Sequence, residues 1–296
     1  LPYNHYQNVT WRQNYSKSKI FPYLCERKLR IMDCNNDKHT LWYLFHTDKL
    51  LLKQTEAEKL SLPTEQEVET FKPYFVGTIH SFTAPNACEC RTVSMNLPNE
   101  MGDEWVWMTL RDAYDYLPIA EYKYGGRAYE LLYWDSHSRF CPVCGTPTQH
   151  LDTIMKKCPS CAHEVYPPIA TATIVLVRRG DEVLLVRARN FRGKHYGLVA
   201  GFLEPGETLE ECVAREVMEE TGLRIRNIQY FGNQPWPYPC GLMVGFTAEY
   251  ESGDIALQAE ELTTAAFFRR DNLPELPRKL SIARRLIEAW KRGDIA

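Results

Sequence analysis

Two Cys-x-x-Cys pairs near the middle of the chain are the strongest constraint on its fold. Cys141 and Cys144 form the first pair, in CPVCG, and Cys158 and Cys161 form the second, in CPSCA, with 13 residues between the two pairs. A two-residue gap lets both sulfurs of one turn reach a single ion, and four thiolates complete the tetrahedral coordination of zinc. The motif therefore predicts a zinc ribbon with one structural Zn²⁺ per chain and no open position for catalysis by that ion.

The composition limits the classes of protein that this chain can belong to. It has 296 residues, of which 44% are apolar and 25% charged, and a net charge of −3 at pH 7. These are ordinary globular values, and they exclude a broadly basic surface for nucleic acid. No run approaches the roughly 18 apolar residues of a membrane span, and the first residues lack an apolar signal core. We therefore expect no membrane partner and an intracellular, cytoplasmic location; a trimmed organellar targeting segment is compatible with the start at Leu1.

Apolar patterns and turn signals divide the chain into four parts. Residues 1–124 mix short apolar runs with turn sequences, which predicts a β-rich α+β domain. Residues 125–139 have apolar positions at helical spacing and predict a connecting helix. Residues 140–168 hold the zinc ribbon, and residues 169–296 form the last domain.

The last domain is predicted to alternate strands and helices. Residues 169–189 form two β-branched, apolar runs around Gly180 and Asp181, which is typical of a hairpin in a buried sheet. Further strands are expected at 242–250 and 264–269. The sequence SIARRLIEAWKRG predicts a closing amphipathic helix that ends near Gly293.

A helix rich in carboxylates follows a glycine loop, AGFLEPGE, in this domain. Thr208 and the glutamate three residues later form a plausible capping box at its start, and Gly222 supplies a left-handed stop. Glu216, Glu219 and Glu220 fall at i, i+3 and i+4, so they share one helix face. Such a face is either solvated or binds cations. Oxygen ligands favour Mg²⁺ or Mn²⁺, and these ions beside a glycine loop suit phosphoryl chemistry in which one glutamate acts as general base.

The string from Gly201 to Leu223 resembles the Nudix box, Gly-x5-Glu-x7-Arg-Glu-(apolar)-x-Glu-Glu-x-Gly-(apolar), at every defined position. The ribbon before it and the sequences QPWPYP and SIARRLIEAW after it are similar to the NADH pyrophosphatase subfamily of Nudix hydrolases, also known for removing NAD caps from RNA. The resemblance covers the chain from about residue 125 to its end, whereas the first 120 or so residues are only loosely similar to that subfamily.

The resemblance implies an α+β protein with a Nudix α/β/α sandwich and a mixed sheet, preceded by the zinc ribbon and the β-rich domain. It also implies a homodimer and divalent-metal-dependent hydrolysis of NAD(H) to NMN(H) and AMP, with NAD-capped RNA 5′ ends as further substrates.

The resemblance assigns roles to the residues of the box. Glu216, Glu220 and the backbone carbonyl of Ala200 are implied to bind Mg²⁺ or Mn²⁺, and Glu219 is implied to be a further ligand or the base. The remaining defined positions of the box are implied to be structural, and Arg215 is implied to orient Glu207. These positions are Gly201, Glu207, Arg215 and Gly222.

Two further assignments rest on single positions. Glu261 is implied to complete the metal site, but its neighbour Glu260 fits the same position and a solvated acid is the alternative. Arg111 is our candidate for the arginine with which the N-terminal domain contacts substrate in relatives. No motif anchors it, so surface solvation is the alternative reading of Arg111.

The substrate-binding positions implied by the resemblance lie in four segments of the chain. Core packing is the alternative role for Tyr166, Phe202 and Ala283. These positions are Tyr166, Phe202, Gln234, Pro235, Trp236, Pro237, Tyr238, Pro239, Cys240, Gly241 and Ala283.

The proline segment, NQPWPYPCG, predicts a rigid loop over residues 233–241, because each proline fixes φ and removes a backbone donor. A stiff connector is one reading of it; a preordered Trp236 that stacks on nicotinamide or a base is the other. Asn233, Tyr238 and Gly241 depart from the subfamily's Ser-Gln-Pro-Trp-Pro-Phe-Pro-x-Ser, and these changes bear on substrate preference.

Three functions are compatible with the sequence. NAD(H) pyrophosphatase activity accounts for both the carboxylates and the aromatic segment. A broader Nudix hydrolase of ADP-ribose or dinucleoside polyphosphates leaves Trp236 without a use. A zinc-ribbon nucleic-acid-binding protein with an inactive Nudix domain predicts a broken carboxylate set, whereas this set is complete.

Overall fold

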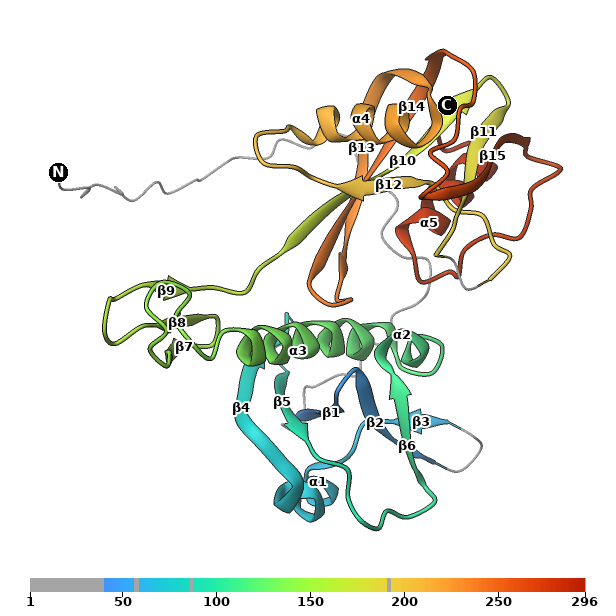
Figure 1. Cartoon of the computed structure of the whole chain (residues 1–296). Helices are drawn as coiled ribbons and strands as arrows, with labels where there is room; N and C mark the ends of the chain where they lie inside the picture. The colour runs from blue at the N-terminus through green and yellow to red at the C-terminus, as the bar shows by residue number, and fades with distance from the viewer. Residues whose placement is uncertain (1–39, 56–58, 86–87, 191–192, 296) are drawn as a thin grey trace, which may run out of the picture. The chain divides into compact units, whose positions relative to one another are not determined.

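The computed structural model describes residues 40–55, 59–85, 88–190 and 193–295. The first 39 residues of the predicted N-terminal domain lie outside the described residues. Figure 1 shows the order of the elements along the chain, from β1 to α5.

A six-stranded sheet forms the N-terminal domain. It runs in the order β3-β2-β1-β5-β4, with β6 paired to β2, and the β1–β5 pair is parallel. Its strands are β1 (Leu41–His46), β2 (Lys49–Gln54), β3 (Leu60–Ser61), β4 (Phe75–Thr83), β5 (Glu89–Met95) and β6 (Trp105–Thr109). Its short helices are α1 (Glu65–Phe71), a 3₁₀ turn (Lys72–Tyr74) and α2 (Leu110–Ala113). The predicted β-rich domain is therefore confirmed over its described part.

The connecting helix, α3 (Ile119–His137), starts six residues before the predicted start at 125. The glycine pair that suggested a helix boundary lies inside α3, where it permits close packing. A Cβ on Gly125 would lie 3.2 Å from the Tyr43 ring, and one on Gly126 would lie 3.0 Å from Pro237. Tertiary packing therefore outweighs the weak helix propensity of glycine.

The zinc ribbon folds as a three-stranded antiparallel sheet in the order β7-β8-β9. The strands are β7 (Gln149–Asp152), β8 (Met155–Lys157) and β9 (Glu164–Val165). They are short, and most of their side chains are exposed. The ribbon thus has little core of its own, which fits a unit held by a metal.

The C-terminal domain is built on a mixed sheet in the order β13-β14-β10-β11-β15, with β12 paired to β10. The β10–β14 pair is parallel and the other pairs are antiparallel. Its elements are β10 (Ala170–Arg179), β11 (Glu182–Ala188), β12 (Val199–Phe202), α4 (Leu209–Thr221), β13 (Arg224–Trp236), β14 (Gly241–Ser252), β15 (Leu262–Arg269) and α5 (Ile282–Arg292). The predicted hairpin, later strands and closing helix are all confirmed.

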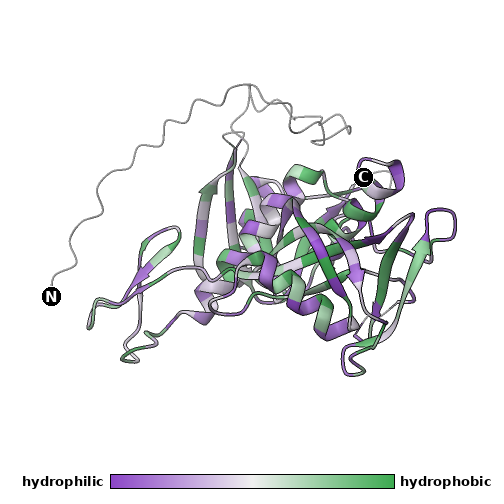
Figure 2. Cartoon of the chain, turned by 90° about the horizontal axis from the view of Figure 1, so that it is seen from above, coloured by the Kyte–Doolittle hydropathy of each residue, from purple (hydrophilic) through white to green (hydrophobic). Residues whose placement is uncertain are grey.

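Two helices cover opposite faces of this sheet (Figure 1). Val175 of β10 belongs to the apolar cluster that contains Val213 of α4, whereas its neighbour Leu176 belongs to the cluster that contains Leu286 of α5. Since successive residues of a strand point to opposite faces, the sheet lies between the two helices. The predicted α/β/α sandwich is therefore confirmed. Figure 2 shows hydrophilic and hydrophobic residues interleaved along the strands and helices, as this layering requires.

The prediction of a loop over 233–241 is wrong for its first half. Residues up to Trp236 belong to β13 and pair with β14, with Gln234 opposite Met243 and Trp236 opposite Gly241. β13 is the outermost strand of its sheet, and an edge strand tolerates proline because one of its sides needs no ladder bonds. The turn itself is confined to residues 237–240.

Within the described part of the chain, no helix is both long and apolar enough to cross a membrane.

Candidate functional site

Helix α4 is fixed at both ends by the residues that its sequence suggested. The Thr208 side chain accepts from the Glu211 N–H and the Glu211 carboxylate accepts from the Thr208 N–H, which completes the capping box. Gly222 ends the helix at φ 73°, and its N–H donates to the Met218 carbonyl. The register of the carboxylates on α4 is therefore set by local chemistry.

The three predicted carboxylates of α4 differ in burial. Glu216 and Glu220 are only 9% and 4% exposed, whereas the side chain of Glu219 is 54% exposed. Two neighbouring buried acids are costly unless a cation or a proton neutralises them. The arrangement therefore excludes a purely solvated face for Glu216 and Glu220.

Gly201 of β12 makes room for the Glu216 carboxylate. A Cβ at Gly201 would lie 1.8 Å from the Glu216 carboxyl carbon and about as close to both carboxylate oxygens. The carboxylate thus rests directly on the glycine backbone, which no other residue type permits. This contact gives the predicted structural role of Gly201 a physical basis.

Arg215 holds the carboxylates of the box together. Its guanidinium bonds both oxygens of Glu207, at 2.6 and 3.0 Å, and also reaches Glu216 at 2.8 Å and Glu219 at 3.1 Å. A further bond, to the Phe202 carbonyl at 2.9 Å, ties α4 to the end of β12. The Arg215 hydrogen bond lowers the pKa of Glu207 to about 2, so this glutamate stays ionised.

A cleft of about 420 Å³ opens beside α4, and Ala200, Glu220, Glu260 and Glu261 line it. Burial first, and then the charges of Glu216 and Glu261, raise the pKa of Glu220 to about 8. Burial also raises the pKa of Glu216. Crowded carboxylates with raised pKa values fit a site that a divalent cation neutralises, and all of these donors are oxygens. The charge of Glu261, rather than that of its neighbour Glu260, contributes to the raised pKa values of both Glu216 and Glu220.

Arg189, the residue that follows β11, also lines this cleft, and no sequence motif singles it out. Its guanidinium donates twice to the Ala259 carbonyl, at 2.6 and 3.1 Å, and its backbone N–H donates to the Glu261 carbonyl at 2.7 Å. The Gln258 N–H donates to the Glu220 carbonyl at 3.1 Å. The turn that carries Glu261 is therefore tied to β11 at one end and to α4 at the other. A lone arginine at a strand end carries no motif, so only the pairing of β11 with β15 reveals this role.

The predicted substrate residues fall into three environments. Phe202 and Tyr166 are 64% and 52% exposed, so their rings are free to meet a ligand or another chain. The Gln234 amide donates to the Leu280 carbonyl, and its oxygen is buried without a hydrogen-bond partner among the described residues. Ala283 is 6% exposed and belongs to the cluster under α5, which favours the core-packing reading.

Trp236 and Tyr238 contact the N-terminal domain. Their rings meet edge to face at 5.0 Å, and the Arg111 guanidinium lies over both, 5.2 Å from the first and 4.5 Å from the second. The Tyr238 hydroxyl pairs with that of Tyr122 at 2.5 Å. The structure thus brings Arg111 to the proline segment, although no motif in the sequence linked the two. The remaining residues of that segment form the end of β13, the turn and the start of β14: Pro235, Pro237, Pro239, Cys240 and Gly241.

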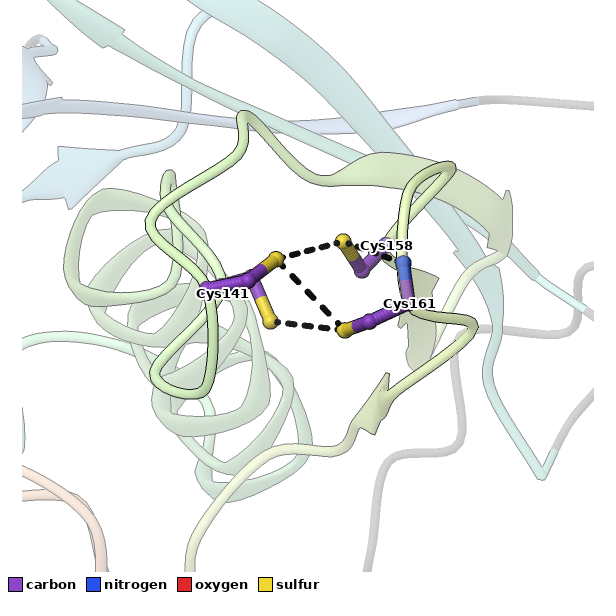
Figure 3. Close-up of side chains that lie close together, drawn as sticks. Cys141, Cys158 and Cys161 are labelled. Atoms are coloured by element: carbon purple, nitrogen blue, oxygen red, sulfur yellow. Dashed lines mark hydrogen bonds between the residues drawn. The ribbon is translucent and has the colours of Figure 1, made fainter.

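The four ribbon cysteines converge on one point (Figure 3). Sulfur–sulfur distances are 3.5 Å for Cys141 to Cys161, 3.4 Å for Cys144 to Cys158 and 3.5 Å for Cys144 to Cys161. A tetrahedral Zn²⁺ with bonds of about 2.3 Å needs sulfurs roughly 3.8 Å apart, so a small expansion accommodates it. The donor set fits structural zinc.

Comparisons with known proteins agree with this architecture. Residues 39–134 match the family model described as NADH pyrophosphatase-like rudimentary NUDIX domain, residues 136–166 match the NADH pyrophosphatase zinc ribbon domain, and residues 167–290 match the NUDIX domain.

The curated relatives include several proteins named NAD-capped RNA hydrolase NudC. The one from Chromobacterium violaceum is 45% identical over 193 residues, which cover 65% of this chain and 72% of that protein. The one from Pseudomonas aeruginosa is 47% identical over 166 residues, which cover 56% of this chain and 60% of that protein. The matched part of this chain thus spans between three fifths and three quarters of the length of these two relatives.

Proposed function

We propose that this chain, which belongs to the Nudix family and carries that family's NADH pyrophosphatase zinc ribbon, hydrolyses the pyrophosphate bond of NAD(H). We also propose that it removes NAD caps from RNA 5′ ends. The products would be NMN(H) and AMP from the free cofactor, and NMN with a 5′-monophosphate RNA from the capped RNA. The observation that carries the proposal is the buried pair Glu216 and Glu220 in a chain whose relatives bear the name NAD-capped RNA hydrolase. Gly201 and Arg215 hold Glu216 in place.

We propose Mg²⁺ or Mn²⁺ as the catalytic metal, bound by Glu216, Glu220, the Ala200 carbonyl and Glu261. When bound, such ions neutralise the phosphate oxygens and lower the pKa of a water molecule that attacks phosphorus. The oxygen-only donor set and the raised pKa of Glu220 support this assignment.

Glu219 suits the role of general base or of a further ligand. Its side chain is exposed, and one oxygen accepts from Arg215 at 3.1 Å, so the carboxylate is not fully committed. A base here would take the proton of the attacking water as the new P–O bond forms and the bridging P–O bond breaks. Arg215 and Glu207 would orient the carboxylates rather than touch substrate.

We propose that aromatic rings bind the nicotinamide or a base. The exposed Phe202 and Tyr166 offer ring faces, and Trp236 lies beside Arg111, a cation that can meet a phosphate. Large exposed apolar side chains also support a homodimer, because a second chain would bury apolar surface that a single chain leaves in water. They include Tyr166, Ile169, Phe202 and Tyr230.

A side-by-side assay tests the function. The full-length protein with Mg²⁺ or Mn²⁺ is given NADH, NAD⁺, ADP-ribose and a 5′-NAD RNA. We expect NMN(H) from the cofactors and NMN from the RNA, with loss of turnover in Glu220→Gln and wild-type turnover in Glu210→Gln, a matched change on the exposed first turn of α4. Cleavage of ADP-ribose alone would refute the proposal in favour of a broader Nudix hydrolase, and wild-type turnover in Glu220→Gln would refute the metal assignment.

A further inference from the structure

A second group of metal-ligating side chains lies outside the proposed active site and outside the cysteine cluster. His80 comes from β4 of the N-terminal sheet, Asp135 from α3 and His150 from β7 of the ribbon. One ligand atom from each of the three lies within 4.8 Å of the other two. Three different elements, of which β4 is distant in the sequence from the other two, thus bring two imidazoles and a carboxylate close together.

The buried histidine of this group has an unsatisfied nitrogen. His80 is 4% exposed, and its Nε2 has no hydrogen-bond partner of acceptable geometry among the described residues, although it faces Asp135 Oδ2 at 3.3 Å. A buried imidazole nitrogen without a partner is costly, and a metal ion is one of the few groups that would satisfy it. His150 Nε2 lies 2.9 Å from the other oxygen of the same carboxylate, Oδ1, and its side chain is 31% exposed.

The spacing of these atoms is close to that of zinc ligands. With bonds of about 2.0–2.1 Å, a tetrahedral Zn²⁺ places its nitrogen and oxygen ligands about 3.3 Å apart. His80 Nε2 lies 3.3 Å from Asp135 Oδ2, which matches that value, and His150 Nε2 lies 2.9 Å from Asp135 Oδ1, which is shorter than that value. The four cysteine sulfurs, at 3.4–3.5 Å, are contracted relative to a zinc tetrahedron to a similar degree.

We propose that His80, Asp135 and His150 form a second Zn²⁺ site, distinct from the ribbon's cysteines. Three protein ligands leave a fourth position for water, and the partly exposed His150 provides access from solvent. The bound ion would join the N-terminal sheet, the end of α3 and the ribbon, so its role is to hold the ribbon in place. The proposal is independent of the proposed function.

Lys156 is the charge that competes with a cation here. Its ammonium lies 2.6 Å from Asp135 Oδ1 and also donates to the carbonyls of Asp135, at 2.9 Å, and Ser138, at 3.4 Å. A metal bound through Oδ2 leaves these contacts in place. The ammonium also lies over the Trp134 ring, 5.2 Å from its centroid, which adds a favourable contact for the charge.

Metal analysis of the full-length protein tests the site. After incubation with Zn²⁺ and desalting, we expect about two zinc ions per chain in the wild type and about one in His150→Ala. His137→Ala is the matched control, since it removes an exposed histidine two residues from Asp135, and it should keep two. Cobalt substitution identifies the ion that is lost, because only the cysteine site gives thiolate-to-cobalt charge-transfer absorption. That absorption should be unchanged in His150→Ala.

One zinc per chain in the wild type, or two in His150→Ala, would overturn the proposal. His80, Asp135 and His150 would then form a polar cluster that binds no metal. His80→Gln gives a second reading, and it should also bind one zinc with the cobalt–thiolate absorption intact. If the buried position of His80 prevents that variant from folding, the partly exposed His150 variant still decides the question.

Discussion

Replacement of Gly201 by alanine tests the contact on which the carboxylate site depends. The added methyl would lie 1.8 Å from the Glu216 carboxyl carbon, whereas ordinary contact begins near 3.4 Å. The carboxylate must therefore retreat by about 1.5 Å, or β12 must move by a similar distance. Displacement of a ligand by about 1 Å costs on the order of 100-fold in rate, which is roughly 2.7 kcal/mol of transition-state stabilisation. Overpacking should cost a further 1–3 kcal/mol, approximately, in the free energy of unfolding.

Three measurements separate these effects. Steady-state hydrolysis of NADH gives the change in kcat/KM, and Mn²⁺ titration followed by the paramagnetic signal of the free ion gives the change in metal affinity. Denaturant unfolding gives the stability cost. Gly232→Ala is the matched control, because a Cβ there meets only the end of Arg285 at 3.9 Å, and it should behave as wild type.

A double-mutant cycle decides the cause. In a Glu216→Ala background the methyl at 201 has room, so Gly201→Ala should then change the free energy of unfolding by less than about 0.5 kcal/mol. If the stability cost of Gly201→Ala is the same with and without the Glu216 carboxylate, the contact is not its source and the reasoning fails.

Three further predictions concern the cleft and the contact between domains. The pKa of Glu220 is about 8 without metal, and a ligand must be ionised, so Mn²⁺ affinity should rise up to about tenfold per pH unit below pH 8 and then level off. The metal-free protein should become less stable as the pH rises toward 8, because the folded state with its raised Glu220 pKa binds a proton that the unfolded chain has already lost. Metal affinity and stability that do not change with pH would contradict this. Arg189→Met removes two bonds to the turn that carries Glu261 and should weaken Mn²⁺ binding by about tenfold, with partial recovery in Arg189→Lys; equal Mn²⁺ affinity in all three proteins would reject the positioning role. Tyr122→Phe leaves the Tyr238 hydroxyl unpaired and should lower the free energy of unfolding, measured in urea, by about 1 kcal/mol. The double variant Tyr122→Phe/Tyr238→Phe should be nearly as stable as the wild type; an equal loss in both variants would show that the hydroxyl pair is not responsible.

Much of the candidate site could be predicted because its information is local. The capping box at Thr208 and Glu211, the stop at Gly222 and the shared face of the α4 glutamates all follow from helix geometry over a few residues. The cysteine pairs are equally local, since each pair lies in one turn. These features were predicted and are found in the structure.

Other features could not be predicted, because they depend on which segments pack together. The start of α3 was missed because two glycines resemble a helix boundary, and only their contacts with Tyr43 and Pro237 explain them within a helix. The first half of the proline segment was predicted as a loop, yet its place on the outermost strand lets it pair with β14.

The sequence by itself determined the family, the zinc ligands of the ribbon and the carboxylate helix, because spacing along one turn or one helix fixes which atoms can meet. The tertiary structure alone decided that Gly201 supports Glu216, that Arg189 holds the turn of Glu261, and that His80, Asp135 and His150 converge. These contacts join residues from separate strands and helices. They depend on sheet order and on the packing of helices against sheets, which local periodicity does not encode.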